Sequence, residues 1–282
     1  MFSRLSITAP RMKGILKRLH LDRSTAVLVL AAIGTGLASC AHNKQFVAKD
    51  VTLETIHVQL PAGNADIDIY WPDTDEPAPV VIITHGFMRV RQNMAGWGKH
   101  LVKAGFVAVI PDLPAWSDHA RNSRFITELQ AFFVDHEAWK QRIDPTRLGL
   151  MGFSAGGLSS LLSAADSPNL ALWVGLDPVD VDGMGARAAA MIQVRTIVLT
   201  AEPSACNAHG NARDIIAALP NPEHSSVAGA VHVDAEWPTS WIGEFICGCS
   251  TEEKRGEFNR LATNALRETL MVPSMSGIQW EH

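Results

Sequence analysis

One serine of the chain stands in a pattern that is typical of an acyl-transferring nucleophile. Ser154 lies between Gly152 and Gly156 in a Gly-x-Ser-x-Gly motif, directly after the apolar run 148–151. The small and apolar residues 157–162 predict the start of a helix. In such a strand–turn–helix context the serine sits on a sharp turn with its hydroxyl above the sheet. We therefore expect Ser154 to be a nucleophile, with the helix N-terminus favouring a developing negative charge.

A nucleophilic serine needs a base, and the order of residues along the chain indicates which histidine supplies it. With this kind of nucleophile turn, the acid and then the histidine follow the serine. His232 comes after the run 226–231, which we expect to be the last strand. Its Nε2 would accept the Ser154 proton and return it to the leaving alkoxide. His209 and His224 also follow the serine and are the weaker competitors.

The acid of the triad is open between two positions. Asp177 closes an apolar run and is followed by a proline. Glu202 follows the next predicted strand, which is a common position for the acid, but Ser204 stands where a second carboxylate is often found. We expect Asp177 to be the acid and keep Glu202 as the alternative. Asp180 and Asp182 are further candidates.

An oxyanion hole is expected beside the nucleophile. His85, Gly86 and Phe87 follow an apolar run that predicts a central strand. We interpret His85 as scaffold of this loop. The backbone N–H groups of Phe87 and Ala155 would hold the tetrahedral oxyanion.

Strand and helix patterns alternate from residue 50 onward. Period-two alternation predicts two edge strands, and continuous apolar runs predict buried parallel strands. The expected strands are 51–58, 67–71, 79–84, 106–110, 148–153, 170–176, 194–200 and 226–231. Amphipathic segments between them predict helices. The fold class is therefore α/β, with a mostly parallel central sheet and helices on both faces.

The composition excludes some functions. The 282 residues carry a formal net charge of -5, so nucleic-acid binding has no electrostatic support. The four cysteines show no spacing typical of a zinc site, and we expect no metal and no organic cofactor.

The N-terminus has the pattern of a targeting segment. A basic stretch at 4–23 precedes an apolar run at 26–33, and Leu-Ala-Ser then leads to Cys40. This pattern resembles a bacterial lipoprotein signal, which implies cleavage before Cys40, lipidation of that cysteine and attachment to a membrane. Residues 1–39 would be the signal and 40–282 a single domain. The protein would lie in the cell envelope, or be secreted if the segment is an ordinary signal peptide.

Export would permit disulfides. We expect Cys206 to pair with Cys247 or Cys249 and one thiol to stay free, with no disulfide as the alternative.

The motifs together resemble the chlorophyllase and cutinase-like polyester hydrolase branch of the α/β hydrolases. His85-Gly86-Phe87 is similar to the oxyanion segment, and the run 152–157 to the nucleophile segment. The run 176–180, Leu-Asp-Pro-Val-Asp, is similar to the segment in which chlorophyllases are thought to place the triad aspartate. The resemblance implies an α/β-hydrolase fold and favours Asp177 as the acid.

The sequence thus favours a serine carboxylic-ester hydrolase acting on a small-molecule or polymeric ester. An amidase, peptidase or thioesterase on the same triad is one alternative, because the triad serves any acyl carbonyl. A non-catalytic envelope lipoprotein is the other. Trp116, Trp237 and Trp241 lie in loops where they would either line an apolar pocket or pack under the loops. The oligomeric state is left open.

Overall fold

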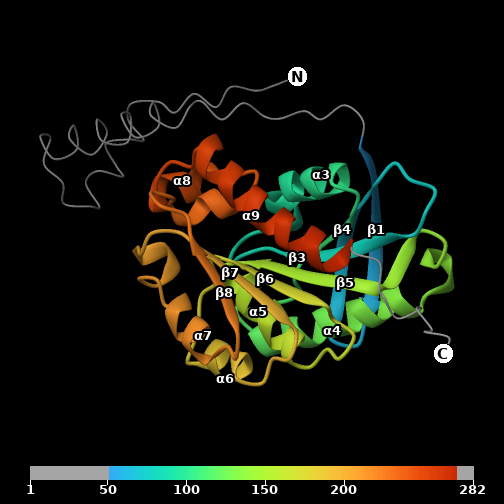
Figure 1. Ribbon diagram of the computed structural model, residues 1–282, viewed down its shortest axis with the longest axis horizontal. Coiled ribbons are helices and arrows are strands. Elements are labelled where there is room, and N and C mark those ends of the chain that lie inside the picture. The colour runs from blue at the N-terminus through green and yellow to red at the C-terminus, as the bar shows by residue number, and fades with distance from the viewer. Residues whose placement is uncertain (1–50, 272–282) are drawn as a thin grey trace, which may run out of the picture. The chain divides into compact units, whose positions relative to one another are not determined.

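Residues 51–271 are described by the computed structural model shown in Figure 1, and their core is a single eight-stranded sheet. The strands are β1 (Thr52–Leu60), β2 (Gly63–Trp71), β3 (Ala78–Thr84), β4 (Val107–Pro111), β5 (Ile143–Phe153), β6 (Leu172–Leu176), β7 (Arg195–Thr200) and β8 (Pro222–Ser226). They lie in the order β1-β2-β4-β3-β5-β6-β7-β8. β2 is antiparallel to both its neighbours, and every pair from β4 to β8 is parallel. This is the mostly parallel α/β sheet that the sequence predicts.

Helices cover both faces of the sheet. The α-helices are α3 (Ala95–Lys103), α4 (His119–Asp135), α5 (Ala155–Ala165), α6 (Met184–Ala189), α7 (Ala212–Ala218), α8 (Trp241–Cys247) and α9 (Glu252–Leu270). Short 3-10 helices are η1 (Arg91–Met94), η2 (Glu137–Trp139), η3 (Ala205–Asn207) and η4 (His232–Ala235). Figure 1 shows α3 and α9 on one face and α4, α5, α6 and α7 on the other. The central strands are therefore buried on both sides.

The continuous apolar runs of the central strands follow from this double cover. Successive side chains of a strand point to opposite faces. In β3, Val80 and Ile82 pack with the core on the α4 and α5 side, whereas Val81 and Ile83 pack with the core on the α3 and α9 side. Each face therefore requires an apolar residue at every second position, and the two requirements together give an unbroken apolar run.

The position of the last strand differs from the sequence-based prediction. We expected a strand at 226–231, but β8 ends at Ser226. Val227 and Ala230 are buried, so the apolar signal of this run is genuine, but it belongs to a turn that Gly229 allows with φ of +71°. β8 itself lies at an edge and carries mostly exposed polar side chains, so it lacks the apolar signal of the central strands.

The predicted signal segment 1–39 and Cys40 lie outside the described residues. Within residues 51–271, no helix is both long and apolar enough to cross a membrane.

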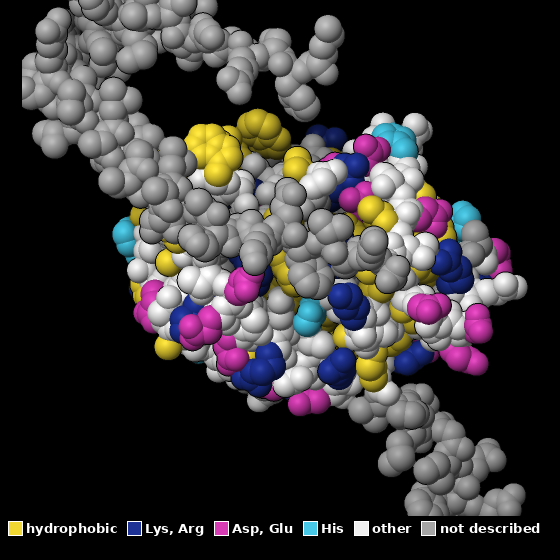
Figure 2. Space-filling model, turned by 90° about the horizontal axis from the view of Figure 1, so that it is seen from above, with side chains coloured by type: hydrophobic (Ala, Val, Ile, Leu, Met, Phe, Trp, Pro, Cys, Tyr) yellow, Lys and Arg dark blue, Asp and Glu magenta, His cyan; other side chains and the backbone are white. Residues whose placement is uncertain are grey.

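Figure 2 shows acidic and basic side chains interspersed on the face it presents, without a large area of one sign.

Candidate active site

The turn that carries Ser154 joins β5 to α5. Ser154 has φ of 54° and ψ of -123°, a strained conformation for a residue other than glycine. The flanking glycines make the turn possible because neighbouring groups lie too close for a side chain. A Cβ on Gly152 would lie 2.4 Å from Ser160 Oγ. A Cβ on Gly156 would lie 2.2 Å from the His85 carbonyl oxygen, so α5 packs directly against the end of β3.

Ser154, His232 and Asp177 form one chain of hydrogen bonds. His232 Nε2 lies 3.0 Å from Ser154 Oγ, and His232 Nδ1 lies 2.6 Å from Asp177 Oδ2. With the proton on Nδ1, the ring donates a hydrogen bond to the Asp177 carboxylate, and Nε2 can accept a hydrogen bond from the Ser154 hydroxyl. Asp177 is only 1 % exposed, so its carboxylate faces the imidazole away from water. The structure thus brings together the three residues that the sequence selected.

The sheet fixes the distance between Ser154 and Asp177. Ser154 and Asp177 follow β5 and β6, which pair in parallel up to Phe153 and Leu176. The Ser154 N–H donates to the Leu176 carbonyl at 3.1 Å, and the Asp177 N–H donates to the Leu199 carbonyl at 2.6 Å. Both residues are therefore held by the ladders of the strands that carry them.

Asp177 receives two further hydrogen bonds, one of them from a residue that the sequence analysis missed. The Ala201 N–H donates to Oδ1 at 3.1 Å, and Asn207 Nδ2 donates to Oδ2 at 3.0 Å. Asn207 is itself fully buried and also donates to the Glu202 carbonyl. Its position at the end of η3, far from any motif, gave no signal in the sequence.

The alternative acids have other partners. Glu202 Oε1 accepts the Gly229 N–H at 3.0 Å. Asp180 accepts backbone N–H groups at the start of α6, from Gly185 at 2.6 Å and Ala186 at 3.1 Å. Asp182 is exposed. The carboxylate hydrogen-bonded to His232 is that of Asp177.

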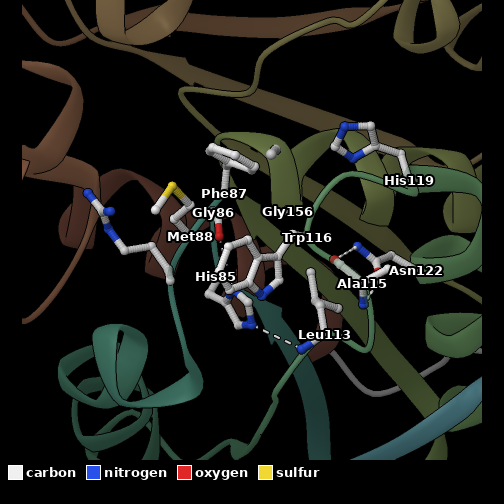
Figure 3. A pocket seen from close by; sticks show the side chains of 12 residues that line it. His85, Gly86, Phe87, Met88, Leu113, Ala115, Trp116, His119, Asn122 and Gly156 are labelled. Atoms are coloured by element: carbon white, nitrogen blue, oxygen red, sulfur yellow. Dashed lines mark hydrogen bonds between the residues drawn. The ribbon is translucent and has the colours of Figure 1, made fainter.

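His85 orients the peptide that the sequence assigned to the oxyanion hole. The Leu113 N–H donates to His85 Nε2 at 2.9 Å, so the ring proton is on Nδ1, which donates to the Gly86 carbonyl at 3.0 Å (Figure 3). Burial lowers the pKa of His85 and keeps the ring neutral. The Gly86 carbonyl and the Phe87 N–H belong to the same peptide, so His85 fixes the plane of that donor. Phe87 and Ala155 line the same pocket.

The other wall of this pocket comes from the loop after β4 and from the start of α4. Asn122 holds the loop through Ala115, accepting its N–H at 3.0 Å and donating to its carbonyl at 2.7 Å (Figure 3). Trp116 stands on this loop and is 71 % exposed. His119 also lines the pocket, with Nδ1 at 3.3 Å from Ser159 Oγ, and burial lowers its pKa. The pocket thus combines aromatic and polar surface.

The three tryptophans expected near the site have different environments. Trp116 lines the pocket. Trp237 packs against Gly96 and His100, within the core on the α3 side. Trp241 is exposed on α8.

A disulfide lies close to Asp177. Cys206, next to Asn207, is bonded to Cys247 of α8, and the pair was one of the two expected. The expectation of one free thiol is wrong for residues 51–271, because Cys249 is also a disulfide cysteine. The cross-link ties η3, which supports Asp177, to the segment that follows His232.

A buried ion pair links the histidine segment to the pocket loop. Arg89 Nε donates to Glu236 Oε1 at 2.6 Å, and the Glu236 side chain is fully buried. Burial raises the pKa of Glu236 to about 7, and the attraction of Arg89 opposes this rise. No cluster of His, Cys, Asp and Glu in the described part of the chain is arranged to hold a metal ion.

The sheet order, the strained serine turn and the sequence order Ser, Asp, His define an α/β hydrolase. Comparison with solved structures agrees on the fold. A dienelactone hydrolase from Anabaena variabilis aligns with a TM-score of 0.62 at 14 % sequence identity, covering 78 % of this chain and 99 % of that one.

The sequence model of the PET hydrolase-like family matches residues 41–245, and the chain belongs to this family. A bis(hydroxyethyl) terephthalate hydrolase of Streptomyces coelicolor is 30 % identical over 118 residues, which are 40 % of this chain and 38 % of the relative. Cutinase 2 of Thermobifida cellulosilytica is 25 % identical over 184 residues, 63 % of this chain and 69 % of the relative. The matched segment thus spans well under half of the first of these relatives.

Proposed function

We propose that the protein is a serine carboxylic-ester hydrolase with Ser154 as nucleophile, His232 as general base and Asp177 as the orienting acid. The observation that carries this proposal is the buried hydrogen-bonded chain from Ser154 Oγ through His232 to Asp177. Membership of the PET hydrolase-like family supports it.

The proposed reaction has two halves. Ser154 Oγ attacks the ester carbonyl carbon while His232 Nε2 takes the serine proton. The tetrahedral intermediate collapses, the bond to the alcohol oxygen breaks, and Nε2 gives its proton to the leaving alkoxide. Water then repeats the sequence on the acyl-enzyme, with His232 as base, and releases the carboxylic acid and free Ser154. Asp177 keeps the Nδ1–H tautomer and stabilises the imidazolium.

The N–H groups of Phe87 and Ala155 are proposed to hold the oxyanion in both halves. His85 holds the Phe87 peptide plane before substrate arrives, so this donor needs no reorganisation during the reaction. A structure of the enzyme with a phosphonate bound to Ser154 tests the assignment, because the phosphoryl oxygen should lie within about 3.1 Å of both nitrogens.

We propose polymeric or small carboxylic esters as substrates. The names of the relatives, a bis(hydroxyethyl) terephthalate hydrolase and cutinases, support an ester. The decisive experiment is turnover of 4-nitrophenyl esters and bis(hydroxyethyl) terephthalate by the wild type and by Ser154→Ala. Activity that is lost in the variant supports the proposal, whereas no turnover by the wild type favours the non-catalytic lipoprotein. Faster cleavage of matched anilides or thioesters would favour the amidase or thioesterase alternative.

We further propose that the chain acts in the cell envelope, anchored through lipid on Cys40, or is secreted if it is not lipidated. The basic stretch, the apolar run and the small residues before Cys40 support this location.

A further inference from the structure

Helix α8 carries its apolar side chains outward and its charged side chain inward. The exposed fractions of its large apolar residues are Trp241 67 %, Ile242 49 %, Phe245 56 % and Ile246 68 %. Glu244 is buried and accepts a hydrogen bond from Ser250 Oγ at 2.7 Å. A surface helix of a globular protein normally has the opposite orientation. The apolar face of α8 therefore lacks a core within the described residues.

Both ends of α8 are fixed, so this face cannot simply turn inward. At the start, Ser240 Oγ accepts the Gly243 N–H at 3.0 Å as an N-cap. At the end, Cys247 is bonded to Cys206 of η3. Figure 1 shows the helix at the periphery of the described domain.

The helix lies beside the mouth of the active-site pocket. A Cβ on Gly243 would lie 2.8 Å from Arg89 Nη2 and 3.4 Å from Val233 Cγ1, so α8 touches the pocket loop and the residue after His232. Phe87 and Met88, which precede Arg89 and line the pocket, are 50 % and 62 % exposed. The exposed apolar residues of α8 are thus carried by a helix that contacts the loop bearing the exposed Phe87 and Met88.

We propose that the outward face of α8 is a docking surface for a solid, uncharged polyester, which it holds beside Ser154. The inference rests on the proposed ester hydrolysis and adds a binding surface outside the pocket. A patch of this kind on a protein surface marks an interaction site. A polymer offers a broad apolar surface around each scissile ester, whereas a small ester would occupy only the pocket.

Charge favours a polyester over a lipid bilayer as the occupant. The segment 237–251 contains no Lys or Arg, and the exposed Glu252 and Glu253 follow it directly. Surfaces that bind anionic lipid use clustered basic residues instead. A neutral polyester matches an apolar face that has no basic residues.

The test compares the full chain with Trp241→Ser and with the double variant Phe245→Ser/Ile246→Ser. Adsorption to amorphous poly(ethylene terephthalate) film and product release from it are measured beside turnover of soluble bis(hydroxyethyl) terephthalate. Losing the two apolar side chains should weaken adsorption and film hydrolysis roughly tenfold or more, with soluble turnover within about twofold. Met191→Ser is the matched control, since Met191 is 61 % exposed beside α6, on the opposite face of the sheet.

Film hydrolysis that is unchanged in the α8 variants overturns the inference. Two further measurements cover other occupants. Loss of sedimentation with anionic phospholipid vesicles, without loss on film, would identify a membrane instead. A change from dimer to monomer by light scattering, again without loss on film, would identify a second copy. If the wild type cleaves no soluble ester, the proposed function fails rather than the docking surface.

Discussion

Replacing Asp177 by Asn tests the arrangement of the triad most directly. The carboxylate faces His232 Nδ1 at 2.6 Å and is also hydrogen-bonded by Ala201 and Asn207. In Asp177→Asn the amide oxygen can still accept from Ala201. In that orientation the amide NH₂ replaces Oδ2, so the hydrogen bond from Asn207 Nδ2 is lost, the NH₂ donates to His232 Nδ1, the ring proton moves to Nε2 and the base is lost. In the flipped orientation the oxygen still accepts from Asn207 and His232, but the negative charge that stabilises the imidazolium is absent.

Asp177 is only 1 % exposed, so no water takes the place of the lost carboxylate oxygen beside Nδ1. We expect kcat to fall about 10,000-fold. This corresponds to a loss of about 5.5 kcal/mol of transition-state stabilisation. The assay is turnover of 4-nitrophenyl butyrate, and circular dichroism checks that the variant folds.

Two neighbouring carboxylates serve as controls. Glu202→Gln keeps an oxygen that can accept the Gly229 N–H, so kcat should stay within about twofold. Asp180→Asn weakens the start of α6 and should lower the unfolding free energy by about 1 kcal/mol without changing kcat. If Glu202→Gln loses three or more orders of magnitude while Asp177→Asn stays active, the assignment of the acid is refuted.

Three further predictions concern stability and location. Burial raises the pKa of Glu236 from 4.5 to about 7 in the folded protein, although the attraction of Arg89 opposes this rise. Between these pH values the folded protein keeps a proton that the unfolded chain has released, so the folded state loses stability as the pH rises. The unfolding free energy is measured by denaturant melts at pH 5 and pH 8. From pH 5 to pH 8 the unfolding free energy of the wild type should fall by on the order of 2–3 kcal/mol more than that of Glu236→Gln. The same fall in both proteins would contradict this prediction. Replacing both Cys206 and Cys247 by Ser opens a cross-link between residues 41 apart and should cost about 4 kcal/mol of unfolding free energy, measured by the same melts. Cys40→Ser should release the protein from membranes, and mass spectrometry of the wild type should find a lipid thioether on Cys40. A disulfide bond at Cys40 in the wild type would contradict this prediction, because the same sulfur cannot also carry the lipid.

Much of the fold follows from local patterns in the chain. The run that ends at Thr84 and the run that ends at Phe153 predict central strands because helices cover both of their faces, which makes every position apolar. The predicted strand at 226–231 was misplaced because burial of Val227 and Ala230 produces the same apolar signal without a ladder. An edge strand such as β8 carries little of this signal, since most of its side chains are exposed.

The site was predictable to the extent that its residues lie in motifs or at strand ends. Ser154 and Asp177 stand at the ends of predicted strands, and the order along the chain selected His232. Asn207 was not predictable, because its contact with Asp177 depends on how η3 folds back after β7. The outward orientation of the apolar residues of α8 was not predictable either. The run Trp-Ile-Gly-Glu-Phe-Ile does not indicate which face of the helix packs against the rest of the domain.

The pairing of β5 with β6 has a consequence for how the protein should respond to heat. Adjacent strands lie about 4.8 Å apart at every temperature at which the sheet persists. Ser154 and Asp177 directly follow these paired strands, whereas His232 lies in a short 3-10 helix outside the sheet. On warming, the His232 ring should therefore lose its hydrogen bonds to Ser154 and Asp177 while the sheet is still folded. Activity should be lost at a lower temperature than the circular dichroism signal of the strands.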